Sequence, residues 1–145
     1  MNKLTKMADN LLSHKKNINY SFLGRFSNQE LYNYYRQKPI DIFINLSTSE
    51  GIPMAIVEVM SFYIPVIATN VGGVSEIINN KNGILISKNP SIVEIVNAIY
   101  KISSTNNNEY YAYKQKAFET WQDRFDAKKT YSKFAIDLHN LQKAN

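Results

Sequence analysis

Apolar residues in the first hundred positions form short continuous runs that alternate with segments of mixed polarity. Four of these runs are short, rich in β-branched residues and bounded by glycine, proline or asparagine, which is typical of β-strands. They cover residues 18–23, 41–46, 64–69 and 84–86. The nearly continuous apolar centre of the second run is expected of a strand that is covered on both faces of its sheet.

The segments between these runs favour helices. Ser27 and Glu30 form an S-x-x-E capping box, and Ser91 and Glu94 form a second one, followed by apolar residues at helical spacing. Pro53 suits the first turn of a helix. The helices that we expect here cover residues 28–37, 54–60, 74–78 and about 92–102.

The last forty residues predict two further helices, after a polar linker at 103–108 and with a cap at Asp126 between them. Each carries an apolar stripe at helical spacing. The stripes are Tyr113, Ala117, Trp121 and Phe125, then Tyr131, Phe134, Ala135, Leu138 and Leu141. We interpret both as surfaces that pack against the body of the domain, with a base-stacking surface as the alternative.

Strands separated by helical segments of this length indicate right-handed βαβ units. The expected fold class is therefore α/β, a three-layer Rossmann-like parallel sheet of about four strands with helices on both faces. Ligands of such sheets bind at the carboxyl ends of the strands, in the loops that lead into helices. Those loops are residues 24–26, 47–53 and 70–73.

Composition narrows the class of protein. The 145 residues allow a single domain over 1–145, and the absence of cysteine excludes disulfides and thiolate metal sites. No apolar stretch approaches a membrane span, and the N-terminus lacks the apolar core of a signal peptide, so we expect a cytoplasmic protein. The net charge of +5 is concentrated at the two ends of the chain. Solvated helix faces explain this excess, and peripheral contact with anionic lipid at the inner face of the membrane is the alternative; we expect no nucleic-acid partner.

Candidate chemistry concentrates at two carboxylates, Glu50 and Glu58, on either side of a predicted strand-to-helix junction. Eight residues of helix rise about 12 Å, which exceeds the roughly 5 Å between the paired acids of a retaining hydrolase. The spacing suits two hydroxyl-rich groups separated by a diphosphate, with Gly51 and the helix start between them as an anion site. The structural alternative remains open: Glu50 as a partner of the helix dipole and Glu58 as a surface residue.

The stretch from Ser47 to Ile86, SxxEGIPMAIVEVMSFxIPVIATNVGGVSEIIxxxNGILI, closely resembles the C-terminal domain of family 4 (group 1) glycosyltransferases, which have the GT-B fold. The E-L-x-x-x-Y pattern at 30–35 and D-x-x-x-x-x-S at 41–47 extend the resemblance, which covers about residues 15–102. It implies retaining transfer from a nucleotide-diphospho-sugar, in polysaccharide or glycolipid synthesis, without a metal or other cofactor. A non-catalytic α/β module that binds a nucleotide or a protein is the alternative function.

The resemblance also implies roles for individual residues. Glu50 is the catalytic candidate and addresses the hydroxyls of the transferred sugar, and Glu58 binds the ribose hydroxyls. The backbone at Gly51, Ile52, Pro53 and Met54 would lie against the sugar and diphosphate. The loop with Gly24, Arg25 and Phe26 would hold the base. For the Gly72-Gly73 turn we favour a structural explanation, a tight strand-to-helix bend that needs small residues.

The chain departs from the family pattern in two ways. Tyr63 stands where the family usually has glycine, so a left-handed conformation there would cost about 1 kcal/mol and the turn is expected to rearrange. The strand and Gly-Arg…Lys loop that open the family's domain are not found before Asn17. We therefore expect a partial domain, inactive alone, whose acceptor binds through a missing N-terminal domain. Its terminal helices over 105–145 would pack on the domain, and its open sheet edge would favour a homo-oligomer.

Overall fold

The computed structural model describes residues 3–143, with the side chains of 138 and 141–143 excepted. It divides into two units, Met1–Tyr34 and Tyr35–Asn145.

The first unit contains α1 (Lys3–Leu12) and the start of α2 (Asn28–Gln37). The predicted capping box of α2 is confirmed. The Glu30 carboxylate accepts hydrogen bonds from Ser27 N at 2.8 Å and Ser27 Oγ at 2.7 Å, and Glu30 N donates to Ser27 Oγ at 3.4 Å. The bonds from Ser27 hold the pKa of Glu30 below its ordinary value.

The prediction of a strand over residues 18–23 is wrong. This segment is irregular and most of its apolar side chains are exposed, among them Phe22 and Leu23. A strand exists only where a neighbour completes its hydrogen-bond ladder, and the ladders of the described residues join three other segments. A β-prone composition is therefore not enough to form a strand.

The second unit is built on a three-stranded parallel sheet in the order β1 (Phe43–Asn45), β2 (Val66–Thr69), β3 (Gly83–Ile86). Its helices are α3 (Met54–Met60), α4 (Val74–Ile77), α5 (Ile92–Ser103), α6 (Asn107–Arg124) and α7 (Ala127–Lys143). The α/β fold class with a parallel sheet is confirmed, with three strands in the described part of the chain instead of about four. The other strands and the helices lie within a few residues of their predicted bounds.

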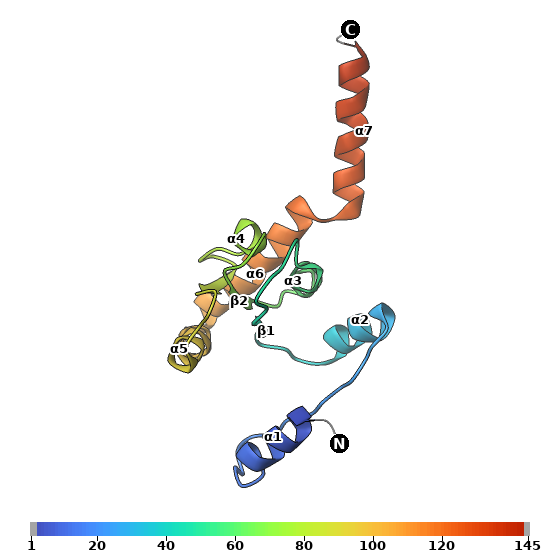
Figure 1. Cartoon of the computed structure of the whole chain (residues 1–145). Helices are drawn as coiled ribbons and strands as arrows, with labels where there is room; N and C mark the ends of the chain where they lie inside the picture. Colours follow the sequence, from blue (N-terminus) through green and yellow to red (C-terminus); the bar gives the residue numbers. More distant parts are fainter. Residues whose placement is uncertain (1–2, 144–145) are drawn as a thin grey trace. The chain divides into compact units, whose positions relative to one another are not determined.

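Buried side chains alternate along β2 between two cores, which places helices on both faces of the sheet. Val66 and Ala68 belong to the first core, with residues of α3, α4 and α6, and Figure 1 shows these helices gathered near β2. Ile67 belongs to the second core, with residues of β3 and α5. The central strand β2 is completely buried. Cover on both faces was predicted for residues 41–46, and this prediction is wrong, because Phe43 and Asn45 of β1 are half-buried and Ile44 is exposed.

The second capping box is only half formed. Ser91 Oγ accepts a bond from Glu94 N at 3.1 Å. The Glu94 carboxylate turns instead to Ser87, accepting from Ser87 N and Ser87 Oγ at 2.7 Å each, and these bonds lower its pKa. The side chain thus fastens the end of β3 to α5.

The turn after α3 keeps the conformation that the family pattern requires, although it holds Tyr63. This residue adopts φ +60°, the positive-φ non-glycine residue among those described. Its ring stacks on Phe118 of α6, with centroids 4.1 Å apart and planes 7° apart. The prediction that this turn rearranges is therefore wrong. Stacking of the Tyr63 ring offsets the cost of its left-handed conformation.

The two C-terminal helices differ in burial. Ala117 is fully buried, and Trp121 and Phe125 pack against the first core, so the stripe of α6 packs as predicted. Tyr131 and Phe134 of α7 are exposed, so for these two residues the prediction that the stripe packs on the domain is wrong. The side chains of Leu138 and Leu141 lie outside the described residues.

Candidate functional site

The carboxyl ends of β1 and β2 form the edge of the sheet where the predicted loops begin. Asn45 and Thr69 are the last residues of these strands, which are parallel and adjacent. The loop from residue 46 to Pro53 therefore starts beside the turn at 70–73, which carries Gly72 and Gly73. This is the place at which open α/β sheets bind ligands.

Polar side chains at the strand ends fix the loop that carries Glu50. Asn45 Nδ2 donates to Glu50 Oε1 at 3.3 Å, and Asn45 Oδ1 accepts from Ser47 N at 2.9 Å. Thr69, which is buried, donates from Oγ1 to the carbonyl oxygen of Ser47 at 2.5 Å. The half-buried Glu50 carboxylate is thus held by β1 directly and by β2 through the loop backbone.

The Gly72-Gly73 turn packs directly on the same loop. Gly72 has φ +51°, and a Cβ there would lie 1.7 Å from the carbonyl oxygen of Glu50. A Cβ on Gly73 would lie 2.8 Å from the carbonyl oxygen of Gly51, which accepts a bond from Gly73 N at 3.1 Å. Both positions need glycine because the backbone of the turn approaches the backbone of the Glu50 loop closely. The small residues therefore serve the packing of the two loops as well as the bend.

Glu58 lies on the second turn of α3 and is half-buried, whereas its neighbours Ile56, Val57 and Val59 are buried. Burial, and then the negative charge of Glu58, raise the pKa of Tyr35. The Tyr35 ring packs on Phe62, with centroids 5.4 Å apart. Glu58 is therefore a half-buried carboxylate whose charge acts on a tyrosine of the second unit.

The segment between the two acids joins loop and helix. Pro53 is buried and caps α3 with its carbonyl oxygen, which accepts from Ile56 N at 2.9 Å and Val57 N at 3.2 Å. Ile52 and Met54 are exposed beside it, as is Gly51. The structure thus presents these three residues at the surface between Glu50 and Glu58, and their contact with a sugar diphosphate stays a prediction.

The predicted base-binding loop lies in the first unit. Gly24 has φ +73°, Arg25 is exposed, and the Phe26 ring lies 5.8 Å from that of Tyr34. The Glu50 loop belongs to the second unit, and the contact of residues 24–26 with a base stays a prediction.

Three residues of this site were missed as functional candidates: Asn45, Thr69 and Tyr35. Asn45 could have been found as a polar residue inside an otherwise apolar strand, and Tyr35 as the tyrosine of the E-L-x-x-x-Y pattern. Thr69 is β-branched and resembles any strand residue, so only its buried hydroxyl bond identifies it.

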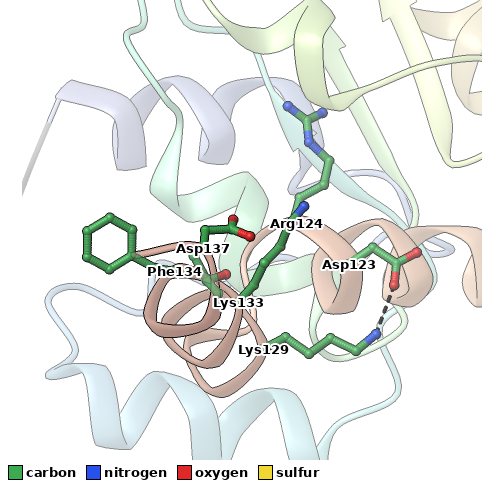
Figure 2. A pocket seen from close by; sticks show the side chains of 7 residues that line it. Asp123, Arg124, Lys129, Lys133, Phe134 and Asp137 are labelled. Atoms are coloured by element: carbon green, nitrogen blue, oxygen red, sulfur yellow. Dashed lines mark hydrogen bonds and ion pairs between the residues drawn. The ribbon is translucent and has the colours of Figure 1, made fainter. Parts of the chain in front are cut away.

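A separate hollow of about 490 Å³ lies between the end of α6 and α7 (Figure 2). Its cations are Arg124, Lys129 and Lys133. Lys129 pairs with Asp123 at 2.9 Å, and Arg124 donates to the carbonyl oxygen of Glu76. Two of the three cations are therefore engaged within the protein, and this hollow contains none of the predicted site residues.

No helix in the described part of the chain combines the length and apolarity that crossing a membrane requires.

Comparison with known proteins supports the resemblance. The family model for group 1 glycosyl transferases matches residues 2–120. An uncharacterized glycosyltransferase of Methanocaldococcus jannaschii is 36% identical over 102 residues, which are 66% of this chain and 28% of that protein. The chain thus spans about a quarter of the length of this curated relative.

Solved structures show the same fold. Sucrose-phosphate synthase of Thermosynechococcus elongatus matches 98% of this chain and 34% of its own, with a TM-score of 0.74 and 21% identity. The C-terminal domain of a group 1 family glycosyl transferase of Francisella tularensis matches 86% of this chain and 61% of its own, with a TM-score of 0.66 and 25% identity. The chain therefore belongs to the group 1 glycosyl transferases and corresponds to their C-terminal, GT-B-type domain.

Proposed function

We propose that this domain binds a nucleotide-diphospho-sugar and presents it for retaining glycosyl transfer. The observation that carries the proposal is the Glu50 carboxylate, held half-buried at the carboxyl edge of the sheet by Asn45 and by the loop that Thr69 fixes. A preorganised acceptor of this kind recognises sugar hydroxyls at a smaller entropy cost than a mobile one.

In this proposal Glu50 addresses the transferred sugar and Glu58 the ribose. Charge-assisted hydrogen bonds to hydroxyls contribute about 1.5–3 kcal/mol each. The exposed segment with Gly51, Ile52 and Met54 and the buried Pro53 lies between the two acids along the chain, where the diphosphate would bind. The loop with Gly24, Arg25 and Phe26 would contact the base.

The acceptor, a saccharide or a lipid-linked sugar of polysaccharide or glycolipid synthesis, would bind elsewhere in the whole protein. The relatives that match this chain are longer than it is, so we expect the 145 residues alone to bind the donor and not to complete transfer. Transfer to any added acceptor by the purified chain would contradict this. A cytoplasmic location at the membrane surface and self-association through the sheet edge stay predictions.

Titration calorimetry of two variants against two ligands tests the site. A panel of UDP-glucose, GDP-mannose and ADP-glucose first selects the donor that binds best, together with its nucleoside diphosphate. We expect Glu58→Gln to weaken both ligands by about 1.5–3 kcal/mol. Glu50→Gln should weaken the nucleotide sugar by a similar amount and leave the diphosphate nearly unchanged.

Glu119→Gln is the matched control, because this carboxylate is exposed on α6 and pairs with Lys116. It should leave both affinities unchanged. Equal losses for both ligands in both site variants would mean that the acids act through the stability of the fold, and the assignment would fall.

A further inference from the structure

We propose that Asn45 is a positioning residue for Glu50 and that its amide gives the site its preference for the sugar-bearing nucleotide. The proposal rests on the proposed function, because it assumes that Glu50 addresses the transferred sugar. Asn45 itself need not touch the ligand.

The orientation of the Asn45 amide follows from its two partners. The Ser47 backbone N–H can only donate, so the group 2.9 Å from it must be the amide oxygen. The amide nitrogen then faces Glu50 Oε1, 3.3 Å away. A flipped amide would oppose N–H to N–H and leave the carboxylate facing another oxygen, so one orientation satisfies both contacts.

The backbone that carries this amide is held by the sheet. Asn45 is the last residue of β1 and is paired in register with Ala68 of the buried strand β2. Ser47, its second partner, is held by Thr69 at the end of the same strand. The donor aimed at Glu50 is therefore fixed by regular structure at both sides, and such support gives a binding group a defined geometry.

Both the oxygen and the nitrogen of the Asn45 side-chain amide are needed for this arrangement. An aspartate at this position would still accept from Ser47 N, but it would place a second carboxylate against Glu50. A leucine would remove both contacts. A carboxylate can accept about four hydrogen bonds, so Glu50 retains acceptor capacity for sugar hydroxyls while one oxygen is engaged by Asn45.

The substitution Asn45→Asp separates positioning from a merely structural role, because it keeps the turn at Ser47 and changes only the group that faces Glu50. The readout is the ratio of affinities for the nucleotide sugar and its diphosphate, chosen from the UDP-glucose, GDP-mannose and ADP-glucose panel. We expect this ratio to fall about tenfold. The added negative charge should lower the diphosphate affinity and the thermal midpoint less than it lowers the affinity for the nucleotide sugar, so the ratio is the readout. Asn45→Leu should lower the ratio and the midpoint together.

A double-mutant cycle with Glu50→Gln provides the second measurement. If Asn45 acts through the Glu50 carboxylate, Asn45→Asp changes the ratio little once Glu50 is already glutamine. Asn97→Asp is the matched control, because it makes the same change at an exposed position of α5, and it should leave the ratio unchanged in both backgrounds.

The outcomes distinguish this inference from the proposed function. An unchanged ratio in Asn45→Asp, or a loss that is equally large in the Glu50→Gln background, would overturn the positioning role alone. The proposed function itself requires that the unchanged chain prefers the nucleotide sugar to its diphosphate and that Glu50→Gln removes this preference. If no such preference is measured, both the proposed function and this inference are overturned.

Discussion

The two C-terminal helices carry the same kind of apolar stripe and end in different environments. Along α6 the stripe packs onto the first core, where Ala117 has no exposed surface. Along α7, Tyr131 is 73% exposed and Phe134 is 61% exposed. Spacing of apolar residues therefore determines that a helix has an apolar face, whereas what covers that face depends on the rest of the fold.

The same contrast separates the region around the Glu50 loop from α7. In the loop region, several positions are constrained by atoms from other elements, such as Gly72 against the backbone of Glu50. In α7, the described side chains are exposed, so few atoms of other elements constrain them. Matched substitutions in the two regions should therefore differ strongly in effect.

The largest difference is expected between two isoleucines. Ile56 of α3 is completely buried, so Ile56→Ala should lower the free energy of unfolding by about 2–5 kcal/mol. Ile136 of α7 is 60% exposed, so Ile136→Ala should change it by less than about 0.5 kcal/mol. Urea denaturation of both variants measures the difference. Similar losses would show that α7 is packed as tightly as α3.

Two glycines of the site give the next contrast. Gly72→Ala forces a methyl group against the Glu50 carbonyl oxygen at a left-handed φ, so it should cost about 2 kcal/mol or more and weaken donor binding. Gly51→Ala is the control, because a Cβ there would meet no atom within 4 Å. Its stability should change by about 1 kcal/mol or less. If Gly72→Ala were as mild as the control, the two loops would not be packed as described.

A double-mutant cycle at Tyr63 and Phe118 tests whether the ring stack offsets the cost of the left-handed conformation at Tyr63. Tyr63→Gly relieves a left-handed conformation that costs about 1 kcal/mol but removes a ring stack that contributes about 0.5–1.5 kcal/mol, so alone it should change stability little. In a Phe118→Leu background the stack is already gone. Tyr63→Gly should then stabilise by about 1 kcal/mol, and a destabilisation in that background would contradict the compensation.

The smallest effect is expected at alkaline pH. Tyr110 of α6 donates to the carbonyl oxygen of Asp41 at 3.1 Å and to its carboxylate at 3.2 Å. Burial, then the charge of Asp41, raises the pKa of Tyr110 from 10.0 to about 12. Because the folded state holds this proton more tightly, its contribution to stability is complete below pH 10 and is lost as the pH rises from 10 toward 12.

Tyr110→Phe should flatten this part of the pH–stability curve, and solvent screening keeps the effect small. Tyr131→Phe on α7 is the control. Urea denaturation at pH 9, 10 and 11 measures both variants, and a curve for Tyr110→Phe that is as steep as that of the unchanged chain would contradict the role of this hydroxyl.

Much of the fold could be predicted from the sequence because the information is local. The helix of Met54–Met60 follows from its apolar residues and preceding proline, and the strand β2 follows from its β-branched run. The segment at 18–23 has the same composition as a strand but no ladder among the described residues. Pairing with a neighbour is a property of the tertiary structure, so composition alone could not decide it.

The candidate site divides in the same way. The sequence by itself determined which acids flank the strand-to-helix junction, because Glu50 and Glu58 belong to a continuous motif. Only the tertiary structure decided what holds Glu50, since Asn45, Thr69 and Gly72 come from two strand ends and a second loop. Hydrogen bonds and steric contact act over a few ångströms in space, and residues as far apart in the chain as Ser47 and Thr69 meet only when parallel strands align their carboxyl ends.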